Sequence, residues 1–312
     1  MLKKAYISIV CLFLSIYAQA YDFEVNGFYY SINSIETLEV EVVPGERKYS
    51  GSIVIPETVS FREKDFKVVG IGVKTFNGSD ITSISIPEGV RYVDNWSFQN
   101  CRNLKSIELP NSLTGIGRSA FKNSGLTKIV IPDKVTQILD SAFVNCTAAK
   151  SITIGKSVRT DGLPTATFIG CSNVEELIIC DSKEELKIRC SNMWKNGQDN
   201  ITFAPFKRLK RVYVGRELRA EYKTYIFPED TQIDHLELGR YVRYFLPWTM
   251  DLKKVTIHRK VPFVSDPMYR RQGDFTTKTK MNAVLYVPKG CVELYKEAEL
   301  WKDFWTIKEI GE

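Results

Sequence analysis

The chain has 312 residues, with 43 lysines and arginines against 37 aspartates and glutamates, and a formal net charge of +6. This small excess of positive charge is not typical of a nucleic-acid-binding protein, in which basic residues dominate. The length would suit two average domains. A repeat protein grows along one axis, however, so its length does not give its number of domains.

Residues 1–20 have the features of a secretory signal peptide. Two lysines precede an apolar run, residues 5–17, and Ala18-Gln19-Ala20 follows it. The run is shorter than the ~20 residues that a membrane-spanning helix needs, and Cys11 lies too deep inside it for a lipid anchor. We expect cleavage after Ala20 and an exported chain that is secreted, periplasmic or at the cell surface, with no transmembrane segment.

A β-hairpin is expected directly after the leader. Residues 22–32 are rich in aromatic and β-branched residues on both sides of Asn26-Gly27. This pair suits a tight primed turn because both positions tolerate positive φ. The hairpin would cover the apolar end of whatever follows, as the N-terminal β cap.

A repeat of 22–23 residues begins at Ser83. Ser-Ile-Ser-Ile-Pro-Glu-Gly-Val is followed by three variants of itself, starting at Ser106, Lys128 and Ser151. The apolar-x-apolar start predicts a short strand with one buried face, and the proline that follows in three of the copies ends the strand. Stacked copies then form a parallel ladder whose second buried residues are Ile86, Leu109, Ile131 and Ile154.

A second series has the same period. Phenylalanine recurs and is followed three positions later by cysteine or serine, in the pairs Phe76 and Ser79, Phe98 and Cys101, Phe121 and Ser124, Phe143 and Cys146, and Phe168 and Cys171. Two series in phase indicate a coil whose turns bury their apolar side chains only by stacking on their neighbours. The outward positions between buried strand residues should line one exposed face, one per turn, at Ser85, Glu108, Val130 and Thr153.

Beyond Cys180 the spacing becomes irregular. Five strand-like segments, the first of them just before Cys180, begin at Leu177, Val212, Leu236, Val255 and Leu285, with long segments between some of them, mainly residues 181–207 and 259–282. Such insertions form loops on one face of a solenoid and often carry binding. The alternative is that the large apolar side chains of residues 181–207 simply pack back on the coil. They are Met193, Trp194, Phe203 and Phe206.

The resulting division of the chain has six parts. We expect a signal peptide at 1–20, an N-terminal β cap at 21–50, regular repeats at 51–180, an insertion at 181–208, irregular repeats at 209–288 and a C-terminal cap at 289–312. The cap should contain a helix within 291–299, because this segment lacks helix breakers and places Val292, Tyr295 and Ala298 at helical spacing.

The unit Ile-x-Ile-Pro-x-x-Val, followed by Phe and then Cys or Ser, resembles the BspA-like leucine-rich repeat of anaerobic bacterial surface proteins. The opening Tyr-Asp-Phe-Glu-Val-Asn-Gly-Phe-Tyr-Tyr and the closing Leu-Tyr-Val-Pro-Lys-Gly resemble Bacteroides-type members. The likeness is specific from Ser52 to Ile179. It implies a right-handed solenoid of stacked short parallel strands, exported and associated with adhesion to host matrix proteins or other cells, without catalytic residues.

No motif for catalysis or for a cofactor stands out, and we expect neither. The two histidines, His235 and His258, lie beside predicted strands one turn apart, but lack further ligands at metal-binding spacing. Six cysteines remain after the leader, and free buried thiols are the expectation. A Cys146–Cys171 or a Cys180–Cys190 disulfide is the alternative in an exported protein.

A rigid repetitive surface favours a scaffold that binds a protein or a matrix component. The alternative is a carbohydrate-binding protein that stacks sugar rings on exposed aromatics such as Trp194, Trp248, Tyr213 and Tyr286. The densest charge cluster, Lys207-Arg208-Leu209-Lys210-Arg211, would suit an acidic polysaccharide or phosphate surface, or is simply a solvated strand entry. The candidate binding surface therefore comprises Ser85, Glu108, Val130, Thr153, Trp194, Lys207, Arg208, Lys210, Arg211 and Tyr213.

Overall fold

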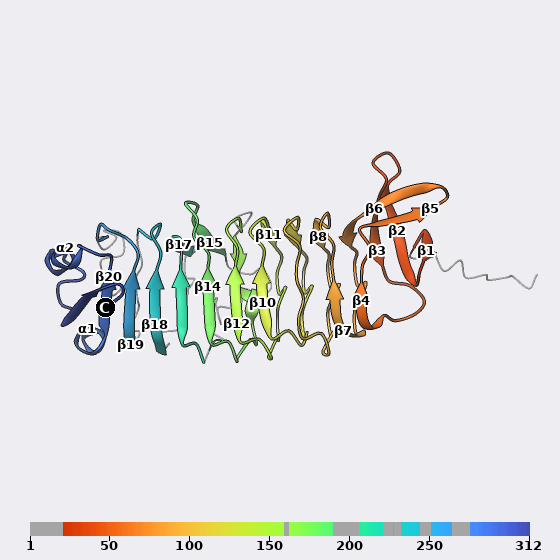
Figure 1. Cartoon of the computed structure of the whole chain (residues 1–312). Coiled ribbons are helices and arrows are strands. Elements are labelled where there is room, and N and C mark those ends of the chain that lie inside the picture. The colour runs from red at the N-terminus through yellow and green to blue at the C-terminus, as the bar shows by residue number, and fades with distance from the viewer. Residues whose placement is uncertain are drawn as a thin grey trace, which may run out of the picture.

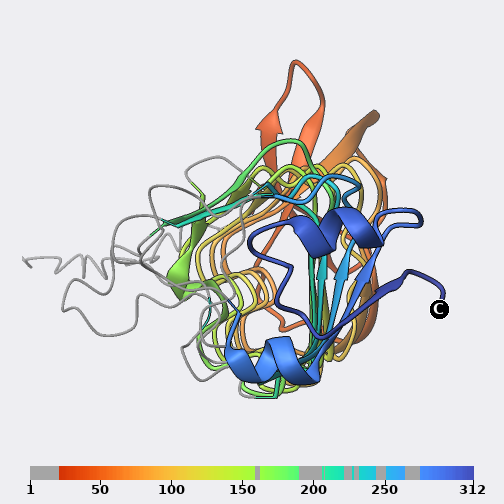
Figure 2. The ribbon, with the colours of Figure 1, turned by 90° about the vertical axis from the view of Figure 1, so that its left-hand side faces the viewer.

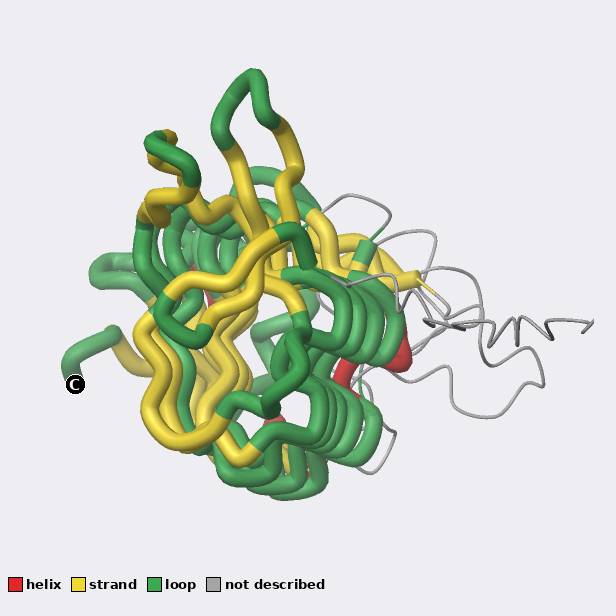
Figure 3. Tube along the Cα trace, turned by 90° about the vertical axis from the view of Figure 1, so that its right-hand side faces the viewer, coloured by secondary structure: helices red, strands yellow, loops and turns green. Residues whose placement is uncertain are grey.

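The computed structural model describes residues 21–158, 162–189, 206, 208–220, 227, 232–243, 251–263 and 275–312. Within these residues the chain is an elongated coil, with strands lying side by side across its long axis and successive turns nested behind one another (Figures 1 and 3). The repeat solenoid expected from the sequence is confirmed.

Two hairpins form the N-terminal end. The first joins β1 to β2 through Asn26 and Gly27, whose φ angles are 53° and 79°. The second joins β5 to β6, and β6 pairs in parallel with β3 to begin the coil. The ring of Phe23 stacks on Phe61 at 4.1 Å between centroids, so the two hairpins pack on each other. The strands are β1 (Phe23–Val25), β2 (Phe28–Ser34), β3 (Glu39–Val43), β5 (Thr58–Phe61) and β6 (Lys64–Ile71).

The long face of the coil is a parallel ladder with one strand per turn. Ile129, Ile152 and Leu177 occupy equivalent buried positions on three successive strands, as the apolar-x-apolar pattern predicts. At the turn containing Glu108 the backbone makes only an isolated bridge with Ser85, so the strand expected there does not form. The ladder therefore consists of a pair, β4 (Ser50–Val54) and β7 (Asp80–Ser85), and a sheet of eight strands: β10 (Lys128–Ile131), β12 (Ser151–Ile154), β14 (Glu176–Ile179), β16 (Arg211–Val214), β18 (Gln232–Leu238), β19 (Asp251–Ile257), β20 (Val284–Val287) and β21 (Thr306–Glu309).

A second face carries shorter strands. β8 (Tyr92–Val93), β9 (Gly115–Ile116) and β11 (Gln137–Ile138) extend the sheet of β6, and β13 (Leu163–Pro164), β15 (Leu186–Arg189) and β17 (Leu218–Ala220) form a sheet of their own. The short 3-10 helix η1 (Thr165–Phe168) follows β13. Strand β15 lies within residues 181–208, the expected insertion, and its buried Leu186 and Ile188 pair with the neighbouring turns on this second face.

The predicted phenylalanine series forms a continuous stack through the core. Neighbouring rings lie 5.0, 5.1, 5.1 and 5.7 Å apart between centroids, and Phe206 extends the stack at 6.1 Å. Of the apolar side chains in the segment 181–207, Phe206 thus packs back on the coil. The thiols that follow the rings are free, and each donates to a phenylalanine carbonyl of the preceding turn, as Cys146 does to Phe121 at 3.2 Å. Burial raises the pKa of the Cys101 thiol to about 11.

The C-terminal end is covered by two short helices, α1 (Thr277–Asn282) and α2 (Val292–Glu297) (Figure 2). The helix expected within 291–299 is α2. Trp301 is fully buried, and its ring packs against Tyr295 and Phe304. Helix α1 was not expected, and it is held by Thr279, whose hydroxyl accepts from the backbone N–H of Leu252 at 3.0 Å.

The ring stack generates a stability prediction. Phe121→Ala removes a ring buried between two others and should lower the free energy of unfolding by about 3–5 kcal/mol. Urea denaturation followed by circular dichroism measures this change. Val130→Ala is the control, because this side chain is 42% exposed and its removal should cost no more than about 0.5 kcal/mol. Equal losses in both variants would contradict the stacked core.

Candidate functional site

Several turns of the coil bend after their ladder strand at a corner with a common form. A proline or glycine ends the strand, two residues follow, and a buried apolar residue donates its backbone N–H to the carbonyl of that proline or glycine. In the regular half this residue is Val90, Leu113 or Val135, and in the C-terminal half Val242 closes the same turn with the carbonyl of Gly239 at 3.3 Å. Cys180 and His258 take the place of the proline or glycine after β14 and β19. The corner residues therefore stack into a column along the edge of the coil.

In the regular half, two carboxylates of this column are bound by the next turn of the coil. The carboxylate of Glu88 accepts from the backbone N–H groups of Asn111 at 2.9 Å and Ser112 at 3.0 Å on the next corner, and these bonds lower the pKa of Glu88. Asp133 pairs with Lys156 at 2.5 Å, which lowers the pKa of that carboxyl. Both carboxylates thus have their partners on the adjacent turn.

Farther along, the corner residues become basic. Gly215-Arg216, Gly239-Arg240 and His258-Arg259 occupy the first two corner positions after β16, β18 and β19. The side chain of Arg216 turns inward, is fully buried, and donates to the carbonyls of Gly155 at 2.7 Å and Lys156 at 2.5 Å. Burial lowers the pKa of Arg216 to about 10, so it stays charged at neutral pH and ties two corners together.

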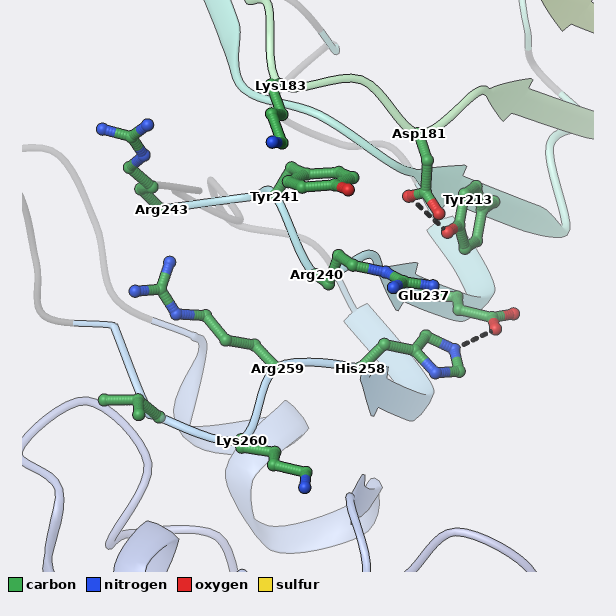
Figure 4. Close-up of a pocket in the computed structure, with 11 residues that line it drawn as sticks. Asp181, Lys183, Tyr213, Glu237, Arg240, Tyr241, Arg243, His258, Arg259 and Lys260 are labelled. Atoms are coloured by element: carbon green, nitrogen blue, oxygen red, sulfur yellow. Dashed lines mark hydrogen bonds and ion pairs between the residues drawn. The ribbon is translucent and has the colours of Figure 1, made fainter.

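The corners after β14, β18 and β19 surround a groove of about 870 Å³ (Figure 4). We call it the basic groove. Its cationic side chains are Lys183, Arg240, Arg243, Arg259 and Lys260. The other lining residues are Asp181, Tyr213, Glu237, Tyr241, His258 and Val261.

Both carboxylates of the basic groove are held by aromatic side chains. The hydroxyl of Tyr213 donates to Asp181 at 2.8 Å, and His258 Nε2 lies 2.5 Å from Glu237 Oε1. Burial and the neighbouring carboxylate raise the pKa of Tyr213, so its proton remains in this bond.

The cations of the basic groove have no such partners. None of the five forms an ion pair with a carboxylate in the part of the chain that the structure describes. Arg240 lies over the ring of Tyr241 at 5.8 Å, and Arg259 donates to the carbonyl of Val242 at 3.3 Å, which orients it along the corner. The groove thus presents several positive charges to solvent with its negative charges already bound.

The structure places the expected binding residues in three different settings. Ser85, Glu108 and Val130 are exposed and Thr153 is half-buried, and they form two pairs on the ladder, Ser85 with Glu108 and Val130 with Thr153. Trp194 and Lys207 lie outside the described residues. Tyr213 alone belongs to the basic groove.

The basic cluster near residue 210 is neutralised. Lys210 pairs with Glu175 at 2.8 Å and Arg211 with Glu176 at 3.2 Å, both across one rung, while Arg208 is exposed. These residues begin β16, and the basic groove lies at the other end of that strand. Of the other aromatics, Tyr286 is half-buried under the ammonium of Lys254 at 4.5 Å, and Trp248 lies outside the described residues.

The two histidines bond to different partners. His235 Nε2 lies 2.9 Å from Thr256 Oγ1, and burial lowers the pKa of His235, whereas His258 bonds to Glu237. Among the described residues no group of three or more His, Cys, Asp or Glu side chains is placed to hold a metal ion. Cys180 is free, and Cys190 lies outside the described part.

The sequence contains a pattern that predicts the basic groove, but a search for contiguous charge clusters does not detect it. When the strands are aligned by their apolar-x-apolar pattern, the residue after the Pro or Gly is Glu57, Glu88, Asn111, Asp133 and Lys156 in early turns. It is Arg216 and Arg240 in late turns. The trend along one column from mainly acidic to basic residues, rather than the density of charge in one segment, marks the site.

Comparisons with known proteins bear on the repeat region. Six copies of the BspA type leucine-rich repeat region match residues 69–195. These residues form a BspA-type leucine-rich-repeat region. Among curated proteins, none matches it significantly.

Solved leucine-rich-repeat structures resemble this BspA-like protein at low identity. One from Bacteroides ovatus is 17% identical, covers 93% of this chain and 100% of its own, and has a TM-score of 0.38. A leucine-rich-repeat protein of T. pallidum is 22% identical, covers 60% and 90%, and has a TM-score of 0.45. A leucine-rich cell surface protein from Faecalibacterium prausnitzii is 15% identical over 75% and 94%, with a TM-score of 0.25. The assignment of residues 69–195 rests on the repeat match and not on these likenesses.

No helix in the described part of this BspA-like protein is long and apolar enough to cross a membrane.

The tight packing at the basic groove yields a second prediction. A Cβ on Gly239 would lie 2.5 Å from Asp181 Oδ1 and 2.8 Å from the Cα of Gly215. Gly239→Ala should therefore lower the free energy of unfolding by about 1–3 kcal/mol in urea denaturation. Gly115→Ala is the matched control, since a Cβ there meets nothing within 4 Å. A Gly239→Ala protein as stable as the Gly115→Ala protein would show that the corner is looser than described.

Proposed function

We propose that this BspA-like protein is an exported, non-enzymatic scaffold that binds an extracellular macromolecule, in the manner of an adhesin, through the basic groove. The observation that carries the proposal is the set of five cationic side chains without ion pairs around two carboxylates that are already bound. Unpaired charges that share one groove attract an oppositely charged partner and increase its rate of encounter.

The solenoid supports this role mechanically. Its turns are tied to each other by the parallel ladder and the ring stack, so residues from three corners keep fixed relative positions. A rigid site loses little conformational entropy on binding. The corner carboxylates Glu88 and Asp133 of the regular half are bound by the next turn, whereas the cations of the basic groove have no carboxylate partner among the described residues.

Export can be tested by itself. The leader at residues 1–20 predicts that the protein recovered outside the cytoplasm of an expressing bacterium begins at Tyr21. N-terminal sequencing or intact mass of that material measures the cleavage point. Retention of the unprocessed chain in the cytoplasm would contradict export.

Binding is tested with arrays of extracellular-matrix proteins and glycans at physiological salt. The unmodified protein should give saturable hits, and Lys183→Gln combined with Arg243→Gln should weaken them by about tenfold, because both cations face the groove and contact no carboxylate. Arg47→Gln with Lys64→Gln removes the same charge from exposed positions at the other end and should leave affinity unchanged. Hits that survive the groove variant would place binding elsewhere.

A further inference from the structure

We infer that the ligand of the basic groove is a linear acidic polysaccharide, a chain of sugar rings bearing carboxylate or sulfate groups, that crosses successive corners of the solenoid. This inference rests on the proposed function and names the partner of the same site. Three observations support this inference: the positive charges of the groove, their arrangement in a row along the coil axis, and the aromatic side chains beside them.

The charges form a row along the coil axis. Glu237 pairs with Thr256 and Thr256 with Tyr286, so the same register places Arg240, Arg259 and Lys289 at one corner position on three successive turns. Adjacent rungs of a ladder lie about 4.8 Å apart. A polymer with charges at regular intervals would therefore meet one cation per turn. Lys289 is exposed and lies on the far side of Arg259 from Arg240, so it extends the row beyond the groove itself.

Arginine at two of these three positions suits the anions of acidic sugars. The guanidinium group presents parallel N–H donors that match carboxylate and sulfate oxygens, and it loses its hydration more easily than an ammonium group. Arg259 is already oriented by its bond to the Val242 carbonyl. The Tyr295 hydroxyl also donates to the Arg259 carbonyl at 2.7 Å, which fixes the backbone there.

The groove also carries aromatic rings beside the charges. Tyr241 follows Arg240 on the same corner and is half-buried, and Tyr213 lies on the wall with its hydroxyl held by Asp181 (Figure 4). A ring with one apolar face accessible can pack against the C–H face of a sugar. Recognition by charge alone would not involve such a ring, so the ring favours a sugar polymer.

An acidic peptide fits this site less well. Extended peptides gain affinity by adding a strand to an open sheet edge. Here β14, β16, β18 and β19 are each paired on both sides, and the groove crosses the ends of these strands rather than an edge. No backbone ladder is therefore offered to a peptide.

The test measures binding by isothermal titration calorimetry of the chain from Tyr21 to Glu312. The probes are a chondroitin sulfate octasaccharide, a neutral dextran oligosaccharide of similar length and poly-L-glutamate of similar charge. We expect the octasaccharide to bind, the dextran not to bind, and the affinity to fall steeply with salt. Arg240→Ser should weaken octasaccharide binding about tenfold, and Arg240→Lys less.

Two pairs of variants separate this route from a merely basic surface. Lys289→Gln should weaken octasaccharide binding several-fold, whereas Lys302→Gln, an equally exposed lysine off the corner column, should not. Tyr241→Ala should weaken it and Tyr241→Phe should retain it, while neither changes the response to poly-L-glutamate. Circular dichroism of each variant confirms that the coil is folded.

The outcomes distinguish the two levels of the proposal. If poly-L-glutamate binds as tightly as the octasaccharide and both depend on Arg240, the polysaccharide inference is wrong but the groove remains the binding site. If neither Tyr241→Ala nor Lys289→Gln weakens octasaccharide binding, the inferred path of the polysaccharide across the corners is wrong. If no probe binds, or binding ignores Arg240, the proposed function of the groove falls as well.

Discussion

Stacking of one turn on the next is the constraint on which this molecule depends. A turn of 22 or 23 residues buries its isoleucines and its phenylalanine only against the equivalent residues of its neighbours, as the ring spacings of 5.0–5.7 Å show. Hydrogen bonds follow the same rule: Asn123 donates to Asn100 at 2.8 Å and Asn145 to Asn123 at 3.1 Å, one amide per turn. Whatever residue a turn carries at a position, it meets its counterpart about 4.8 Å away.

The same constraint governs charge. Two like charges on adjacent corners repel each other. In the regular half some corner charges are compensated by the next turn, since Asp133 pairs with Lys156 and Glu88 is bonded to the backbone of the next corner. In the C-terminal half Arg240 and Arg259 are neighbours without an intervening carboxylate in the described chain. Arg216, which would add another positive charge to this edge, is instead withdrawn into the coil to bind carbonyl groups. Repulsion that is left uncompensated in the free protein is relieved when an anion binds.

Much of the fold follows from period and pattern. The apolar-x-apolar strands, the phenylalanine stack, the Asn26-Gly27 turn and the helix α2 occur where the sequence places them. Two features did not follow. β15 has the required pattern in Leu186 and Ile188, but it lies in a long segment that broke the period, and at Glu108 the strand pattern is present without a continuous ladder.

The site was harder to predict, because it is assembled from corners far apart in the sequence. Lys183 and Arg240 come from turns separated by 57 positions, whereas the conspicuous cluster at Lys210 and Arg211 lies next to Glu175 and Glu176 one rung earlier. Local charge density therefore identifies residues whose partners are distant in sequence and close in space. Alignment of the corners by strand register would have revealed the change from acidic to basic residues.

We propose that binding occurs on the corner column of the C-terminal half and not on the face of the regular ladder. Hydrogen–deuterium exchange of the full mature chain, measured with and without a saturating chondroitin sulfate oligosaccharide, locates the binding surface. Slower exchange confined to peptides that contain residues 181–183, 239–243 and 258–261 is the predicted result. Protection centred on Ser85, Glu108, Val130 and Thr153, or no protection at all, would contradict it.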